Sequence, residues 1–226
     1  MDYAVVAFVD VLGFAEMVQT DSKAPKPKFL NTFLKVLENI RANHGDAVRM
    51  FSDSIVIEAG LELIGVQRVL SVARDLQIEF LGQGVLVRGG VAFGKHYSDV
   101  NAIYSEALVN AYYIESRRAR NPRIVVDPNL IDYFKHHPDA SAEQVDWIAG
   151  ALCRDRDGCS FIHYIDSESL EELTPKVASV LASTDRRSDS VVEKICWLLD
   201  YHSFICSSVG REDLKLHDAR LSFSAC

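Results

Sequence analysis

The feature that most constrains the fold is an unbroken apolar run near the start of the chain. Residues 5–9 read Val-Val-Ala-Phe-Val, and the run ends at Asp10, shortly before Gly13. A short apolar run that is bounded by a turn signal is typical of a buried strand. A carboxylate at the end of such a strand must be solvated, cap the next helix or bind a cation, because burying an unpaired charge is costly.

Hydrophobic periodicity predicts an alternation of strands and helices along the rest of the chain. The expected elements are a strand at 3–10, a helix at 27–45, a hairpin of 47–51 and 54–59, a helix at 63–81, a strand at 85–94, a helix at 105–116, a strand at 122–127 and a hairpin at 154–164. The first of these hairpins would carry Asp53 at or near its tip. This order predicts a ferredoxin-like α+β domain, with helices on one face of a mainly antiparallel sheet.

We expect two parts, a domain at 1–166 and a C-terminal helical extension at 167–226 that packs on it. The extension contains the apolar sequence WLLDYH, in which Trp197, Leu198 and Tyr201 would face the core. The adjoining His202 is expected to be a hydrogen-bonded packing residue and not a catalyst.

The composition excludes several classes of protein. With 32 acidic and 24 basic side chains the formal charge is −8, which opposes non-specific binding to nucleic acid. No apolar run approaches the ~20 residues that cross a bilayer, and the N-terminus lacks the positive region of a secretory signal. The five cysteines form no CxxC pair, so reduced thiols are expected. We therefore expect a cytoplasmic protein without direct membrane contact.

The two aspartates at strand ends are the strongest candidates for a site. In the predicted topology the first strand and the hairpin are neighbours, so Asp10 and Asp53 can converge. Paired carboxylates suit Mg²⁺ or Mn²⁺ and leave coordination positions for substrate phosphates. The tight turn at Gly13 into a helix would expose N–H groups that suit phosphate oxygens. Alternatively, Asp10 caps that helix and Asp53 merely forms a turn.

Four stretches in this order resemble class III nucleotide cyclases, over about residues 3–127. FVDVLGF and MFSDSIVI resemble the two metal motifs of that family, VLVRGGVAFG its arginine-glycine strand, and YSEALVNAYYIES the helix that delivers its transition-state residues. EALVNAYYIESRRARNPRIVV and KICWLLDYH are further similar to the pyrimidine nucleotide cyclases of Pycsar antiphage defence, bacterial enzymes that make cyclic CMP or cyclic UMP.

The resemblance implies a homodimer with two shared active sites. Asp10, Asp53 and the carbonyl of Val11 would bind two Mg²⁺ or Mn²⁺ ions, and Gly13 and Phe14 would bind substrate phosphates. The ions would activate the ribose 3′-hydroxyl and neutralise the β- and γ-phosphates. The products would be a 3′,5′-cyclic nucleotide and pyrophosphate, and a separate effector protein would bind the cyclic nucleotide in antiphage defence.

The base-binding positions depart from those of adenylate cyclases. Arg49 stands where those enzymes carry a base-reading lysine. The position of their base-reading aspartate falls near Ile103, so adenine recognition loses its usual partner. An arginine can only donate, so it favours the acceptor O4 of uracil, and we expect UTP in preference to CTP. Tyr3 is a second candidate, which would stack on or bond a base held across the dimer interface.

The transition-state residues leave two alignments open. Asn110 can stand for the family's asparagine, but the arginine four residues on would then be Ile114, with Arg117 one turn further as a substitute. If Glu115 fixes the alignment instead, Asn110 is one residue out of place. Arg88 lies in a strand and is expected to pair with an acidic neighbour rather than to contact substrate.

Three functions therefore compete. The first is an active pyrimidine cyclase, making cyclic UMP or, alternatively, cyclic CMP. The second is a degenerate cyclase-like domain that binds a nucleotide or a partner without turnover, which the missing arginine favours and the two aspartates oppose. The third is a nucleic-acid-binding module of ferredoxin-like fold, which the acidic balance and the buried first strand oppose.

Overall fold

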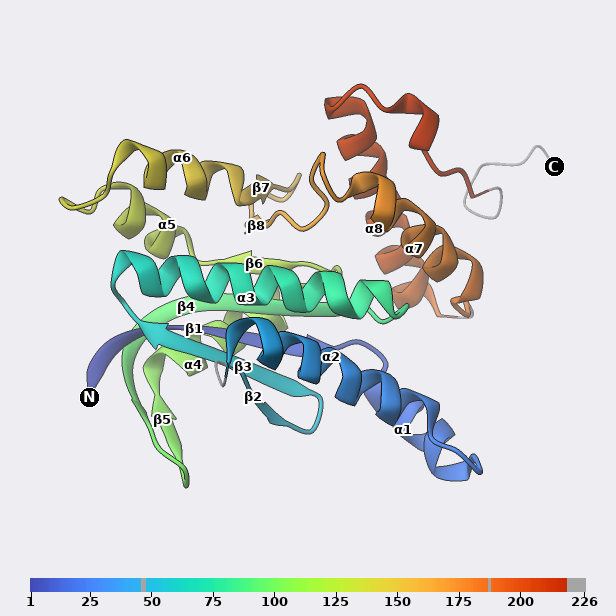
Figure 1. Ribbon diagram of the computed structural model, residues 1–226, viewed down its shortest axis with the longest axis horizontal. Helices are drawn as coiled ribbons and strands as arrows, with labels where there is room; N and C mark the ends of the chain where they lie inside the picture. The colour runs from blue at the N-terminus through green and yellow to red at the C-terminus, as the bar shows by residue number, and fades with distance from the viewer. Residues whose placement is uncertain (46–47, 187, 219–226) are drawn as a thin grey trace.

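The computed structural model describes residues 1–45, 48–186 and 188–218. The chain forms a mixed α+β fold around one sheet of eight strands (Figure 1). The strands are β1 (Asp2–Val11), β2 (Val48–Phe51), β3 (Ser54–Gly60), β4 (Val87–Ser98), β5 (Ile103–Ser105), β6 (Ile124–Val126), β7 (Leu152–Arg154) and β8 (Ser160–Ile162). The helices are α1 (Phe14–Lys23), α2 (Lys28–His44), α3 (Leu63–Gly82), α4 (Glu106–Arg118), α5 (Pro128–Lys135), α6 (Ala142–Gly150), α7 (Leu170–Ser183) and α8 (Asp189–Ser208), with a 3₁₀ turn at Glu212–Leu214.

The strand order places the first strand in the middle of the sheet. The order is β2-β3-β1-β4-β6-β8-β7, and β5 pairs with β4 outside this path. All pairs are antiparallel except β4 with β6, which confirms the expected mainly antiparallel sheet. Because β1 pairs with both β3 and β4, the ends of these three strands meet beside Asp10.

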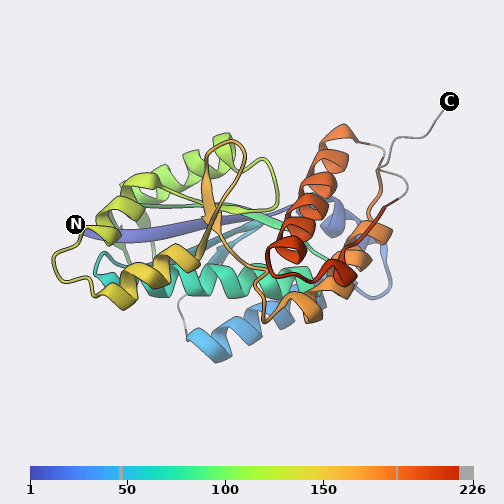
Figure 2. The same ribbon diagram turned by 90° about the horizontal axis from the view of Figure 1, so that it is seen from above.

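Helices cover both faces of the sheet (Figure 2). Helices α2 and α3 bury their apolar faces against alternate residues of β1, among them Val5, Ala7 and Val9. The intervening residue Val6 packs instead with Ala107 of α4, because successive side chains of a strand point to opposite faces. The expected arrangement of helices on one face thus applies to α2 and α3, whereas α4 lies on the other face.

A glycine makes the close approach of α4 possible. A Cβ atom on Gly90 of β4 would lie 2.2 Å from the carbonyl oxygen of Ala111 and 2.9 Å from the backbone nitrogen of Glu115. Only a residue without a side chain fits between strand and helix at that distance. This contact fixes where α4 sits relative to the end of β1.

The C-terminal helices build a second apolar core against the sheet and α3. Leu198 and Tyr201 of α8 are buried, as expected, and Trp197 packs against the same cluster. The hydroxyl of Tyr201 accepts hydrogen bonds from the backbone N–H groups of Tyr164 and Ile165, both at 3.2 Å. His202 is buried and contacts the hydroxyl of Thr174 at 2.9 Å, which confirms its packing role.

Periodicity does not reveal several elements of the second half. Helices α5 and α6 and the short strand β5 were not predicted, whereas the hairpin of β7 and β8 was, and α7 and α8 lie within the helical extension expected at 167–226. The four cysteines within the described ranges are free thiols, as expected, and Cys226 lies outside those ranges. Across the described residues, no helix is long and apolar enough to span a membrane.

Candidate active site

The structure brings the two predicted aspartates together. Asp10 pairs with Ser54 across β1 and β3, and Asp53 directly precedes Ser54 in the hairpin turn. The carbonyl of Asp53 accepts a hydrogen bond of 3.1 Å from the N–H of Val11. Ser52 adopts a left-handed conformation with φ of 56°, which closes this tight turn. The two aspartates therefore occupy one end of the sheet, as the sequence predicts.

The electrostatic surroundings of Asp10 include the charges of Asp53 and Arg88. The pKa of Asp10 is raised, chiefly because burial disfavours its charged form, and the charge of Asp53 adds to the increase. The hydrogen bond and positive charge of Arg88 act in the opposite direction on that pKa. Arg88 lies opposite Asp10 in the β1–β4 pair, and its Nε donates to Oδ2 of Asp10 at 3.2 Å. The expected pairing of Arg88 with an acidic neighbour is confirmed.

A third carboxylate reaches this group from α4. Glu115 has a side chain only 4% exposed, and its Oε1 lies 2.8 Å from Nε of Arg88. Burial raises the pKa of Glu115, Arg88 lowers it, and Asp10 and Asp53 raise it again. In the sequence, Glu115 stands out only as a marker of alignment. The sequence signal that could have identified Glu115 is its place near the end of α4, because this helix runs back along β4 towards Arg88.

The turn after Asp10 leads into α1 without a side-chain cap. Gly13 has a φ of 77°, a left-handed conformation that favours glycine, and it precedes the first residue of the helix. The ring of Phe14 packs against Phe29 at a centroid distance of 5.6 Å. Only the backbone of Phe14 is therefore placed for the predicted phosphate contact, and the first turn of α1 offers N–H groups to an anion.

The donor set fits a divalent cation that prefers oxygen. Two carboxylates and the carbonyl of Val11 lie at the strand ends, and such hard oxygen ligands suit Mg²⁺ or Mn²⁺. Within the described part of the chain, no group of three or more His, Cys, Asp or Glu side chains is placed to hold a metal ion. The candidate site therefore rests on the two aspartates, and it leaves further coordination positions for ligands from a substrate.

The predicted base-binding residues lie apart from the aspartates. Arg49 shares a sheet face with Asp10, because it pairs with Val56 and Val56 pairs with Phe8. Its guanidinium donates to the carbonyl of Asp99 at 2.8 Å and lies 3.4 Å from Glu58. These contacts turn Arg49 away from the hairpin tip.

Tyr3 is further from the aspartates than Arg49 is. It lies at the opposite end of β1 from Asp10, roughly 23 Å along the strand, and points to the other face of the sheet. Its side chain is exposed. Within one protomer, Tyr3 and the two aspartates therefore do not form one site.

The α4 candidates separate along the helix. The amide of Asn110 reaches the carbonyl of Phe93 at 3.5 Å, several residues along β4 from Arg88. Ile114 packs against the C-terminal core, and the guanidinium of Arg117 lies 4.5 Å from the centre of the Tyr113 ring. Of these α4 residues, Glu115 is the one beside the carboxylates. Ile103, the other expected departure, lies in β5.

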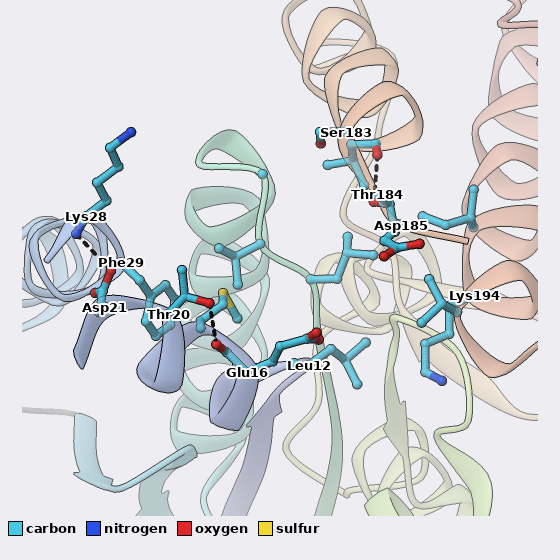
Figure 3. A pocket seen from close by; sticks show the side chains of 18 of the residues that line it. Leu12, Glu16, Thr20, Asp21, Lys28, Phe29, Ser183, Thr184, Asp185 and Lys194 are labelled. Atoms are coloured by element: carbon cyan, nitrogen blue, oxygen red, sulfur yellow. Dashed lines mark hydrogen bonds between the residues drawn. The ribbon is translucent and has the colours of Figure 1, made fainter. Parts of the chain in front are cut away.

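A cavity of about 830 Å³ opens beside the Gly13 turn, between α1 and the C-terminal helices. Figure 3 shows Leu12 and Glu16 below it, and Thr184, Asp185 and Lys194 beside the C-terminal helices. Neither Asp10 nor Asp53 lines this cavity. Burial and the positive charge of Arg88 lower the pKa of Lys194, whose Nζ donates to the carbonyl and hydroxyl oxygens of Ser190. No sequence pattern points to Lys194.

Solved cyclase domains are similar to this chain at low identity. The guanylyl cyclase domain of the RhoGC fusion protein from the aquatic fungus Blastocladiella emersonii is 16% identical, with 71% of this chain and 93% of that one covered and a TM-score of 0.47. The guanylate cyclase domain of RhGC from Catenaria anguillulae, solved with GTP, is 14% identical, covering 72% and 96%, with a TM-score of 0.43. A bacterial light-regulated adenylyl cyclase is 10% identical, covering 79% and 98%, with a TM-score of 0.44.

No protein-family profile and no curated protein sequence matches the chain. We take the function from the side chains of the candidate site and from the sequence motifs.

Proposed function

We propose that this chain is a nucleotide cyclase that converts a pyrimidine nucleoside triphosphate, preferably UTP, to its 3′,5′-cyclic monophosphate and pyrophosphate. The observation that carries the proposal is the meeting of Asp10 and Asp53 beside the left-handed turn at Gly13. The four cyclase-like motifs of the sequence supply the reaction class. The nucleic-acid-binding alternative assigns no role to this pair of carboxylates.

In this proposal the chain's own residues bind and orient the triphosphate. Asp10, Asp53 and the carbonyl of Val11 would hold two Mg²⁺ or Mn²⁺ ions, which supply positive charge that favours the 3′-alkoxide and neutralises the phosphates. The N–H groups after Gly13 would bind phosphate oxygens. The 3′-oxygen forms a bond to the α-phosphorus and loses its proton, while the bond to the β-phosphate oxygen breaks and pyrophosphate leaves.

A homodimer forms part of the proposal, because the base-binding candidates lie away from the aspartates within one protomer. Large aromatic side chains remain exposed on α4 and on the sheet face that carries Asp10. Phe51 is 83% exposed, and Tyr112 and Tyr113 of α4 are each nearly half exposed. Exposed aromatic side chains are enriched where proteins associate. A second protomer on this face could place its Arg49 near the carboxylates of the first, whereas Tyr3 points to the opposite face of the sheet.

A single assay tests the activity and the base preference. The purified chain is incubated with equal amounts of ATP, GTP, CTP and UTP plus Mn²⁺, and the products are identified by mass. We expect cyclic UMP and pyrophosphate in excess over every other cyclic nucleotide. Predominant cyclic CMP would contradict the assignment of Arg49 as a reader of uracil O4, because an arginine donates and cytosine presents an amine there.

A catalytically degenerate domain is the second candidate. The observation that favours it is the environment of α4, where Ile114 packs in the core and Arg117 lies over Tyr113. Neither side chain is then placed to stabilise charge at the α-phosphate. Nucleotide binding without any cyclic product in the same assay would support this candidate against the active cyclase.

The biological role in the proposal follows the Pycsar-like segments of the sequence. The cyclic nucleotide would act as a second messenger in antiphage defence and would be bound by a separate effector protein. This role would be supported if expression of the chain protected cells from phage only when both Asp10 and Asp53 were intact.

A further inference from the structure

Arg88 lies between two carboxylates that come from different elements. Its Nε is 3.2 Å from Oδ2 of Asp10 on β1 and 2.8 Å from Oε1 of Glu115 on α4. Only the longer of these contacts has hydrogen-bond geometry. Among the described residues, Oε1 of Glu115 is buried and has no hydrogen-bond partner, although Arg88 is close by. The single Nε–H of Arg88 is thus aligned with Asp10 while a nearer oxygen lacks a donor.

Burial makes this arrangement unfavourable for Glu115. A buried carboxylate oxygen without a donor costs free energy that one aligned hydrogen bond recovers. The close approach of Gly90 to α4 fixes the backbone of Glu115 beside β4, and its side chain, only 4% exposed, lies against Arg88. Alignment of Nε–H with Glu115 would give this oxygen a donor and release Asp10.

The charges around Asp10 also favour a pairing of Arg88 with Glu115. A divalent cation at Asp10 would be repelled by Arg88, whose Nε lies 3.2 Å from Oδ2 of Asp10. Asp53 attracts the cation, and Glu115 offsets Arg88. If Glu115 lost its charge, Arg88 would have Asp10 as its remaining counterion and would compete with the cation for it.

We infer that Glu115 is the second counterion of Arg88 and that it keeps Asp10 available to a divalent cation. Glu115 is on this account a positioning residue, since it acts through Arg88 and does not itself hold the cation. The inference rests on the proposed function, because it takes Asp10 as a cation ligand.

Binding of Mn²⁺ alone, measured without nucleotide by the electron paramagnetic resonance signal of free Mn²⁺, tests this inference. We expect Glu115→Gln to weaken Mn²⁺ binding about tenfold, since the substitution leaves Asp10 as the remaining counterion of Arg88, which then competes with the cation. The double variant Arg88→Met/Glu115→Gln removes the competing guanidinium as well. It should bind Mn²⁺ within about threefold of wild type, because its net charge at the site is that of wild type.

Asp157→Asn is the matched control. Arg123 is shared between Asp155 and Asp157, as Arg88 is shared between two acids, but this group lies at the β7–β8 hairpin. The control removes one carboxylate from a shared arginine and should leave Mn²⁺ affinity unchanged.

The outcomes separate the inference from the function on which it rests. Wild-type Mn²⁺ affinity in a folded Glu115→Gln variant would overturn the inference, and so would a double variant as weak as Glu115→Gln alone. A wild-type chain whose Mn²⁺ binding is no better than that of Asp10→Asn would instead overturn the proposed metal site.

Arg88→Met gives a second test if Glu115→Gln does not fold. It removes the competitor of the cation for Asp10, so Mn²⁺ affinity should equal or exceed that of wild type. Weaker Mn²⁺ binding by Arg88→Met would show that Arg88 supports the cation site and would overturn the inference.

Discussion

Among single residues, the two aspartates of the candidate site are the ones that we expect to tolerate exchange for amides least. An asparagine in place of Asp53 would keep the size of the side chain and the turn but remove half of the negative charge that the pair offers to a cation. The Asp10 carboxylate would remain beside Arg88, which already neutralises part of its charge.

We therefore expect Asp53→Asn to lower Mn²⁺-dependent cyclisation by at least about a hundredfold, a loss typical of removing a metal ligand from a catalytic site. Product formation is measured by mass at saturating Mn²⁺. Asp132→Asn, at an exposed position of α5, is the control and should retain full activity. Near-normal turnover by Asp53→Asn would remove Asp53 from the site.

Among the strands, helices and turns, buried contacts set where the site residues lie. Gly90→Ala would place a methyl group 2.2 Å from the carbonyl of Ala111, so α4 would have to move away from β4. We expect a loss of about 2 kcal/mol or more in the free energy of unfolding, which is typical of overpacking a well-packed interior. Urea denaturation measures this loss. Gly150→Ala, where nothing lies within 4 Å, should be neutral or slightly stabilising.

The β7–β8 hairpin is tied to the start of β6 by an ion pair with a defined pH dependence. Arg123 is almost fully buried and bonds both Asp155 and Asp157. The hydrogen bond from Arg123 lowers the pKa of Asp157 to about 2, below its usual value of 3.8. A carboxyl with a lowered pKa binds fewer protons in the folded state, so its contribution is present above about pH 4 and disappears as the pH falls towards 2.

Asp157→Asn should therefore destabilise the chain at pH 6 by about 1 kcal/mol or less, because the carboxylate is half exposed and solvent screens the pair. The difference from wild type should shrink steadily as the pH is lowered from 4 to 2. Urea unfolding at several pH values measures it. A difference that stays constant over this range would mean that the charge of Asp157 does not contribute.

For the complete assembly, the proposed dimer predicts that two inactive chains rescue one another. Asp10→Ala would abolish cation binding in the half-site of its own chain, and Arg49→Ala would damage base binding in the half-site of its partner. A mixed dimer then contains one intact site and one site with both lesions. Random exchange makes about half of the dimers mixed, so roughly a quarter of wild-type activity should return.

The control mixes Asp10→Ala with Asp53→Ala, whose lesions lie in the same half-site and should not complement. If co-expressed Asp10→Ala and Arg49→Ala chains form mixed dimers but recover no activity, Arg49 does not share a site with the carboxylates of the partner. The base pocket would then have to be built from other residues.

Local sequence patterns were sufficient to predict the first half of the fold and the location of the carboxylates. The apolar run of β1, the hairpin around Asp53 and the helix after Gly13 carry strong local signals, because alternation and turn residues act over a few positions. Neighbouring strands then bring Asp10 and Asp53 together without further information. Helices α5 and α6 were missed because they span only 8 and 9 residues, too few to show a clear helical period.

Long-range packing, by contrast, sets which residues surround the aspartates. The approach of α4 depends on Gly90, and it brings Glu115, not Asn110, beside Arg88. Packing of α8 likewise places Lys194 in the lining of the cavity beside Gly13, from far along the chain. These contacts join segments whose separation in sequence carries no periodic signal. Their geometry follows from how closely helices can pack on the sheet, which local sequence patterns do not encode.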